Sequence, residues 1–384
     1  MSNKNSVISG FTFWPVGTGD SSTVKIAKDI YLQIDIRHMD KAEDNDDPAY
    51  PVIDHLVEIL PKQSGKPYLS TFALTHPDKD HCQGFEELLK RVAIGELWLS
   101  PRTFQEYKND LCEDAQVFQK EAQRRVEETI KADGDPGAGN RIRIIGYDDL
   151  LKESDYKDFP AEFLSIPGHS VTLLDGNDYE GRFCAFIHAP FHDDSYGDRN
   201  DCSLAFQITL INEGYEGKAL YFGDLTYPIL KRIFTISEPE NLEWNILLAP
   251  HHCSKSAMYW KEEGEEDESL KKEILELMEK YALDTGYIIA SSAPIPTSNE
   301  SGDNPPHVKA KREYLKIAPN DFYCTHEHPN KSNPLPVVFA ITNTGFEYLD
   351  SEDDQSTSLS ETIDKAEGNK EAPAIAVGYG CYEE

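Results

Sequence analysis

Thr75-His76-Pro77-Asp78-Lys79-Asp80-His81 is the stretch of sequence that most strongly constrains the fold. It follows an apolar run at 68–74, which predicts a buried strand whose carboxyl end carries the polar residues. Because alternate side chains of an extended segment point the same way, His76, Asp78 and Asp80 can converge on one side. A turn into a helix would bring His81 beside them. Two imidazoles and two carboxylates this close suit two divalent ions better than one closed structural zinc site.

The alternative for this stretch is a polar loop at the start of a helix, with Asp78 or Asp80 as the N-cap. Two further strand ends favour a site. Gly223-Asp224 ends one apolar run, and Pro250-His251-His252-Cys253-Ser254 ends another. Loops seldom place ligand-type side chains at three strand ends, so the sequence predicts that these segments meet around metal ions.

The order of these segments resembles the metallo-β-lactamase fold and, within it, the hydrolase domain of the ComEC competence-protein family. That family's pattern is Gly-x-Gly-Asp, Ile-Asp, Thr-His-Pro-Asp-x-Asp-His, Asn-x-x-Ser-Leu, Gly-Asp and Pro-His-His-Gly-Ser, followed by a closing strand. The matching segments here are Gly17-Thr18-Gly19-Asp20, Ile34-Asp35, Thr75–His81, Asn200-Asp201-Cys202-Ser203-Leu204, Gly223-Asp224, Pro250–Ser254 and Ile341-Thr342-Asn343-Thr344-Gly345. The resemblance covers roughly residues 9–350, with insertions.

The resemblance implies an α/β protein with a four-layer αββα metallo-β-lactamase sandwich, helical insertions and two divalent metal ions, zinc or manganese. The implied ligand assignment is His76 and Asp78 on one ion, Asp80 and His81 on the other, Asp224 between them, and His252 completing the second site. The catalytic candidates are Asp80, Asp224 and His251. For His251 three roles stay open, as a ligand, as a group that orients a ligand, or as a donor to the transition state. Asp35 would orient a ligand, or else is a turn carboxylate.

The chain departs from the family pattern at several of these positions. Asp78 stands where most of the superfamily has histidine, and harder oxygen ligation moves the preference from zinc toward manganese. The third histidine of the first site has no clear counterpart, because Asn200 occupies the matching region. His169 and His188 are candidates for it, with a turn or core histidine as the alternative for each. Cys253 replaces a glycine, which is unfavourable if its φ is positive.

Composition narrows the class of partner. The formal charge is −32, from 69 acidic and 37 basic residues, so the surface field repels a long nucleic-acid backbone. The seven cysteines include no Cys-x-x-Cys pair, which argues against a thiolate zinc site and a disulfide framework.

No window approaches the ~18 apolar residues of a membrane helix, and the N-terminus lacks the apolar core of a secretory signal. We expect a cytoplasmic protein with no membrane contact.

The domain organisation follows from the charge pattern. We expect one hydrolase domain over 1–350 and an acidic, partly mobile tail over 351–384. Charged helical patterns predict inserts at about 104–135 and 257–283, which would be the docking surfaces if a protein partner exists.

Gly17–Asp20 is interpreted as a tight hairpin turn, because no Lys-Ser/Thr helix follows it. The late histidines are interpreted mostly as surface residues, of which one could reach the mouth of the site: His307, His326 and His328.

The leading functional hypothesis is hydrolysis by a metal-bound hydroxide, in a phosphodiesterase or nuclease acting on a nucleotide or nucleic acid. The charge favours a short or cyclic nucleotide over long duplex. One alternative is a hydrolase of a lactone, thioester or amide, since one fold hosts many reactions. The other is a partner-bound subunit of a multiprotein system, for example a defence system.

Overall fold

The computed structural model describes most of the chain between residues 9 and 349. The described residues are 9–39, 50–105, 111–147, 149–153, 156–196, 199–298, 302 and 304–349. The boundary expected at 350 and the tail at 351–384 lie outside them.

The first sheet contains ten strands among the described residues, in the order β21-β20-β1-β2-β3-β5-β6-β7-β8 with β4 beside β5. Neighbours are antiparallel from β21 to β3 and parallel from β3 to β8. Its strands are β1 (Ser9–Phe13), β2 (Ser22–Ala27), β3 (Ile30–Ile34), β4 (Lys62–Gln63), β5 (Lys66–Ala73), β6 (Ala93–Leu99), β7 (Arg141–Ile145), β8 (Leu164–Ser165), β20 (Val337–Thr342) and β21 (Gly345–Leu349).

The second sheet has the order β19-β18-β15-β14-β13-β12-β9. It is parallel from β19 to β14 and antiparallel from β14 to β9, so it repeats the mixed design of the first sheet. Its strands are β9 (Ser170–Val171), β12 (Phe183–Ala189), β13 (Ala205–Asn212), β14 (Tyr215–Tyr221), β15 (Trp244–Leu248), β18 (Ala282–Ala290) and β19 (Asp321–Cys324).

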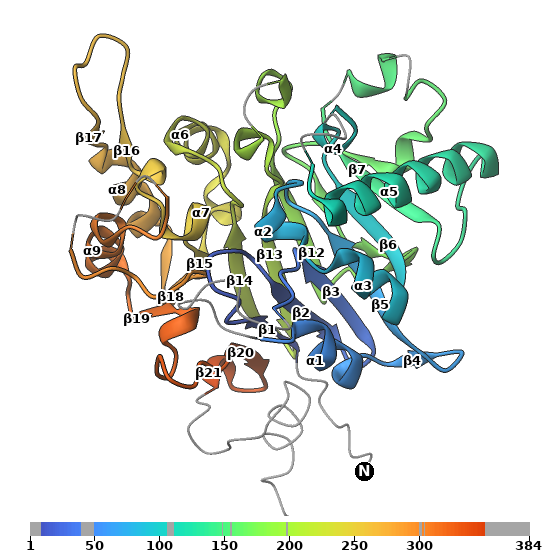
Figure 1. The fold of residues 1–384 in the computed structure, drawn as a ribbon, viewed down its shortest axis with the longest axis horizontal. Helices are drawn as coiled ribbons and strands as arrows, with labels where there is room; N and C mark the ends of the chain where they lie inside the picture. The colour runs from blue at the N-terminus through green and yellow to red at the C-terminus, as the bar shows by residue number, and fades with distance from the viewer. Residues whose placement is uncertain are drawn as a thin grey trace, which may run out of the picture.

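Helices cover the outer faces of the two sheets. They are α1 (Val52–Ile59), α2 (Lys79–Cys82), α3 (Phe85–Arg91), α4 (Arg102–Gln105), α5 (Glu113–Ala132), α6 (Tyr227–Ile236), α7 (Pro250–Cys253), α8 (Lys272–Lys280) and α9 (Val308–Ile317). Apolar residues of α1, α3 and α5 pack on the first sheet, and those of α6, α8 and α9 pack on the second. In Figure 1 the two sets of helices stand on opposite sides of the strands.

A third apolar cluster lies between the sheets, where Phe11 and Phe13 of β1 meet Phe206 of β13 and Tyr221 of β14. The layers are therefore helices, sheet, sheet and helices, because each sheet buries one face on the other and one face on helices. The expectation of an α/β protein is confirmed, and its architecture is that of an α/β sandwich.

The segment at 104–135 differs from the helical insert that we expected. Its described part is the end of α4 and the long helix α5, which runs between the parallel strands β6 and β7. The buried residues Ala115, Phe118, Ala122 and Val126 follow the helical period and pack on the first sheet. This helix is thus a crossover of the core fold, although its charge made it look like an insertion.

The segment at 257–283 is helical only in its last third. It begins with a two-stranded hairpin, β16 (Tyr259–Trp260) and β17 (Ser269–Leu270), which projects from the body beside α8 (Figure 1). The acidic stretch between the two strands includes Gly264 in a left-handed conformation, which a helix does not accommodate.

No helix in the described part of the chain is long and apolar enough to cross a bilayer.

Candidate metal centre

The polar residues that follow the parallel strands of both sheets meet at one edge of the sandwich. Asp35 follows β3 and His76 follows β5 of the first sheet, while Asp224 follows β14 and His252 follows β15 of the second. Backbone hydrogen bonds hold these ends together, including one of 3.0 Å from the Leu204 N–H to the Thr75 carbonyl, which joins the two sheets. The carboxyl ends of parallel strands are where open α/β sheets place their ligands.

Four of the predicted residues form a compact cluster. His81 Nε2 lies 3.2 Å from His252 Nε2 and 3.3 Å from Asp224 Oδ1. His252 Nε2 lies 3.5 Å from Asp224 Oδ1 and 3.2 Å from Asp80 Oδ2. Metal–ligand bonds of about 2.0–2.1 Å in a tetrahedron separate the ligand atoms by about 3.3 Å. The side chains are therefore spaced as the ligands of one ion would be.

Two buried atoms at this centre have no hydrogen-bond partner among the described residues, His76 Nε2 and Asp224 Oδ1. Leaving a buried donor or acceptor unpaired costs about 1–3 kcal/mol. A cation is the partner that both an imidazole lone pair and a carboxylate oxygen accept. These atoms and the spacing around them fit a metal ion.

Two further side chains face the other oxygen of Asp224, and a third lies beside one of them. Its Oδ2 lies 3.7 Å from His76 Nε2 and 3.5 Å from His251 Nε2. His76 Nε2 is also 3.7 Å from Asp78 Oδ2. His251 thus lies beside His76, at the position of the third histidine of the first site, for which the sequence showed no clear counterpart.

Asp35 is fully buried and orients the motif from behind. Its Oδ1 accepts a 2.7 Å hydrogen bond from the Thr75 N–H, and its Oδ2 accepts a 2.6 Å bond from the Thr75 hydroxyl. Asp35 Oδ2 also lies 2.8 Å from His81 Nδ1. A carboxylate on Nδ1 sets the tautomer that points Nε2 at the metal position. These contacts place Asp35 behind the motif, and its role in supporting a metal ligand stays a prediction.

Ser203 links the predicted Asn200 segment to the same centre. Its Oγ lies 3.3 Å from His76 Nδ1 and accepts a 3.2 Å hydrogen bond from the Asp224 N–H. The Ser203 hydroxyl in turn donates to the Asn200 carbonyl at 2.7 Å. Asn200 therefore supports the site through its backbone and Ser203.

Asp20 belongs to the centre, although its segment looked like a simple hairpin turn. Asp20, His81, Asp224 and His252 are all buried and bring one ligand atom each within 4.8 Å of one another, so this cluster could hold a metal ion. Asp20 Oδ1 lies 3.5 Å from His252 Nδ1, and Oδ2 lies 4.0 Å from His81 Nδ1. Both contacts are on the Nδ1 side of the rings, opposite the Nε2 atoms that face Asp224. We therefore assign Asp20 to orienting the two imidazoles.

Charge coupling is strong within the cluster. Burial alone lowers the pKa of His81 and His252, but nearby carboxylates, above all Asp224, outweigh it and raise both pKa values well above the usual range. Burial raises the pKa of Asp224, and these two imidazoles outweigh that effect and hold its pKa well below the usual range. Burial lowers the pKa of His76 to about 3, which keeps its lone pair free. Because metal ligands must be deprotonated, a bound cation would compete with protons at these imidazoles.

The turn that carries His251 and His252 is strained. Three consecutive residues adopt left-handed backbone angles, with φ of 50° at His251, 53° at His252 and 66° at Cys253. The concern that Cys253 replaces a glycine at a positive φ is thus confirmed. His307 holds the turn in place, since its N–H donates to the Cys253 carbonyl at 3.0 Å and its Nδ1 accepts from the Lys255 N–H at 3.2 Å. Strain of this kind persists where the surrounding contacts determine the conformation.

Two candidate histidines do not join the centre. His169 is exposed in the turn before β9, where its backbone pairs with Ile166 and Ile187. His188 is buried against the Ser237 hydroxyl and the Asn241 carbonyl, each at 3.0 Å, and burial lowers its pKa to about 4. His169 is a turn histidine and His188 a core histidine.

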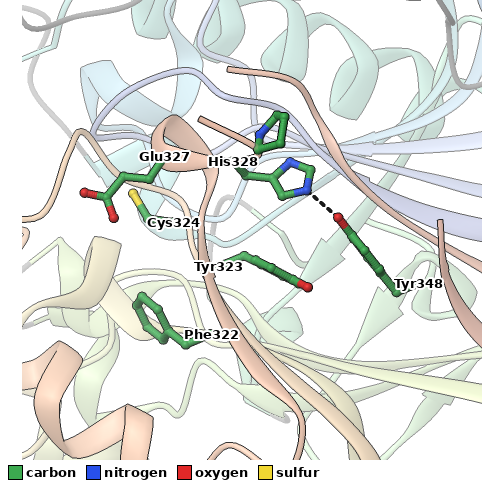
Figure 2. Close-up of a pocket in the computed structure, with 7 residues that line it drawn as sticks. Phe322, Tyr323, Cys324, Glu327, His328 and Tyr348 are labelled. Carbon is green, nitrogen blue, oxygen red and sulfur yellow. Dashed lines mark hydrogen bonds between the residues drawn. The ribbon is translucent and has the colours of Figure 1, made fainter. Parts of the chain in front are cut away.

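The late histidines are buried, so the surface interpretation is wrong for all three. His328 lines a pocket of about 410 Å³ whose lining includes none of the predicted metal ligands. Figure 2 shows its ring pointing at the Tyr348 hydroxyl, with Tyr323 beside them. Late position in the chain did not reveal this burial, because burial depends on contacts with distant segments, such as that of His307 with Cys253.

Gly223 offers a test of how closely Asp224 is positioned. Its φ is +49°, and a Cβ there would lie 2.7 Å from the Ser203 Cβ. We expect Gly223→Ala to displace Ser203 and Asp224 and to weaken metal binding at least about tenfold, as loss of outer-shell support does. Metal titration followed by calorimetry measures this. Gly214→Ala is the matched control, because Gly214 has a φ of +90° with nothing within 4 Å. Equal affinities for the two variants would contradict close positioning of Asp224.

Comparison with models of known protein families finds no match, and comparison with curated proteins finds no significant relative. The assignment of a function therefore rests on the fold and on the site.

Proposed function

We propose that this chain is a metal-dependent hydrolase of the metallo-β-lactamase type, with two divalent ions, that cleaves phosphodiester bonds in a nucleotide or short nucleic acid. The observation that carries the proposal is the position of Asp224 between two sets of ligand-type atoms. Its Oδ1 faces His81 and His252, and its Oδ2 faces His76 and His251. A carboxylate that presents each oxygen to a different set is suited to bridge two ions.

Each set would hold one ion. His76, Asp78, His251 and Asp224 Oδ2 would hold the first, and Asp80, His81, His252 and Asp224 Oδ1 would hold the second. Both sets combine imidazole nitrogen with carboxylate oxygen, which suits zinc or manganese. When bound, the ions would lower the pKa of a water molecule from about 15.7 toward neutrality and offset negative charge on the scissile group.

Exposure separates the roles of the side chains that move protons. The Asp80 side chain is 34% exposed and that of Asp224 is 4% exposed, so Asp80 is the carboxylate that can take a proton from water and pass it to solvent. His251 is 21% exposed, compared with 1% for His252. His251 thus stands at the open side of the centre, where a substrate would approach the first ion.

A guanidinium at the rim favours a phosphodiester over a neutral ester. Arg199 Nη1 lies 3.0 Å from Asp78 Oδ1, and its side chain is 32% exposed. A guanidinium binds phosphate oxygens through two parallel hydrogen bonds. The net charge of −32 disfavours a long duplex, so a short nucleotide substrate fits this chain best.

Metal analysis combined with substrate profiling tests the proposal. Purified protein is expected to contain about two equivalents of zinc or manganese per chain by elemental analysis. It is expected to hydrolyse bis-p-nitrophenyl phosphate and to lose that activity after chelation. The double variant Asp80→Asn/His81→Ala should retain its fold by circular dichroism and lose both metal and activity.

Three outcomes would overturn parts of the proposal. Turnover of lactones or thioesters without any phosphodiester cleavage would reject the substrate class. A single equivalent of metal would reject the two-ion arrangement. A protein that binds no metal, and whose double variant is indistinguishable from it, would reject the metal centre and leave a role as a subunit of a larger assembly.

A further inference from the structure

Two thiols meet directly behind the metal centre. Cys82 ends α2, the short helix that begins within the Thr75–His81 motif, and Cys112 is the residue before α5. Their sulfur atoms lie 3.5 Å apart. A disulfide bond is about 2.05 Å long, so the sulfurs would need to approach by only about 1.5 Å. Neither thiol is used by the proposed hydrolysis, which leaves this contact without a role.

The environment of Cys112 favours reaction there. Cys112 is half-buried, whereas Cys82 is buried, so an oxidant in solvent reaches Cys112 first. Cys112 is the N-cap of the 20-residue helix α5, and its sulfur accepts a 3.5 Å hydrogen bond from the Ala115 N–H. A hydrogen bond from Cys82 is the main cause that lowers the pKa of Cys112 to about 6. Thiols at helix N-termini react as thiolates.

We propose that Cys82 and Cys112 form a reversible disulfide when the protein meets a peroxide. The Cys112 thiolate attacks one oxygen of hydrogen peroxide, the O–O bond breaks, and Cys112 becomes a sulfenic acid as hydroxide leaves and takes up a proton to form water. The Cys82 sulfur then attacks the Cys112 sulfur, the S–O bond breaks, and a second water leaves with the Cys82 proton. In sum, two thiols lose two electrons and two protons, and one peroxide becomes two waters. A dithiol reductant reverses the reaction by exchange.

The disulfide would act on the metal ligands through the backbone of α2. The single Cys82 S–H can donate to the Asp78 carbonyl oxygen, 3.1 Å away, or to the Cys112 sulfur, and a disulfide has no proton to donate to either. The same short helix carries Asp80 and His81. Movement of Cys82 toward Cys112 would draw these ligands away from Asp224. We expect metal affinity to fall by about tenfold, as it does when outer-shell partners are lost. This effect rests on the proposed metal site, whereas the disulfide itself does not.

Peptide mapping after oxidation tests the modification separately from the hydrolase. Full-length protein is treated with hydrogen peroxide, alkylated and digested, and the linked peptides are identified by mass spectrometry. The expected product joins the peptides that contain Cys82 and Cys112, and it disappears after dithiothreitol treatment. Cys112→Ser should yield no such product. Cys184→Ser, which changes another half-buried thiol on β12, should yield as much product as the unchanged protein.

Titration with manganese or zinc, before and after oxidation, tests the coupling. About tenfold weaker binding in the oxidised protein, restored by dithiothreitol and absent in Cys112→Ser, would support it. A protein that forms the disulfide and binds metal unchanged would overturn the coupling. Peroxide treatment that yields only sulfinic or sulfonic acids at Cys112, or links other cysteines, would overturn the pairing. A protein that binds no metal in either state would reject the proposed function and the coupling, while the peptide map still decides the pairing.

Discussion

Replacing Asp224 with asparagine is expected to reduce phosphodiester hydrolysis by about a thousandfold and to remove at least one metal ion from the protein. Asp224 faces both sets of ligand atoms, through Oδ1 on one side and Oδ2 on the other. An amide keeps the shape of the side chain but offers one oxygen. Its NH2 group, in place of the second oxygen, has no lone pair with which to bind a cation.

Two measurements separate binding from chemistry in this variant. Elemental analysis gives the number of ions retained, and kcat at saturating metal gives the loss of turnover. Asp178→Asn is the control, because Asp178 is exposed on β11 (Asn177–Asp178) and its oxygen accepts from the Glu180 N–H, as an asparagine oxygen can. An Asp224→Asn protein with two ions and near-normal turnover would show that Asp224 does not bridge.

Replacing Asp35 with alanine is expected to destabilise even the metal-free protein by about 3–5 kcal/mol. The reason is that the Thr75 N–H, the Thr75 hydroxyl and the ring of His81 would lose a common, fully buried partner. For a domain of this size the unfolding temperature should fall by about 5–10 °C. Calorimetry in the presence of a chelator measures this without a contribution from bound metal.

Asp35→Asn is the matched variant for this prediction. Asp35 has a φ of 53°, a conformation that asparagine tolerates better than alanine does. The asparagine oxygen can take the place of Oδ1 and accept from the Thr75 N–H, whereas the NH2 group in place of Oδ2 cannot accept from the Thr75 hydroxyl or from His81. We expect an intermediate unfolding temperature. If alanine and asparagine both leave the unfolding temperature unchanged, the hydrogen bonds of Asp35 do not stabilise the fold.

Local patterns predicted the strands and the polar residues that end them. The apolar run at 68–74 overlaps β5, and the apolar runs that end at Gly223-Asp224 and Pro250 correspond to β14 and β15. These elements follow from neighbours in the chain, because strand alternation and the helical repeat are properties of segments shorter than twenty residues. The same reasoning could not place α5. Its exposed face is charged, and the buried face became visible only when it packed on the first sheet.

The residues of the candidate metal centre were not all predictable from the sequence, because some belong to local motifs and others meet only through tertiary packing. His81 and His252 were recognised from their motifs, although 171 positions separate them in the chain. Asp20 was missed because its contact with His252 depends on the turn after β1 reaching the end of β18, where the Ser291 hydroxyl donates to the Gly19 carbonyl at 2.6 Å. A carboxylate after Gly-x-Gly was the signal that could have found it. His307 has no comparable signal, since its role is to hold the strained turn at Cys253.

Which side chains of ligand type stand at the ends of strands could be predicted from local sequence patterns. The tertiary structure alone decided that Asp224 turns one oxygen to each of two groups, that His251 fills the gap in the first group, and that Cys82 meets Cys112. These relations depend on the order of strands in two sheets and on how the sheets stack. Both are fixed by the sum of many long-range apolar contacts, to which no single motif corresponds.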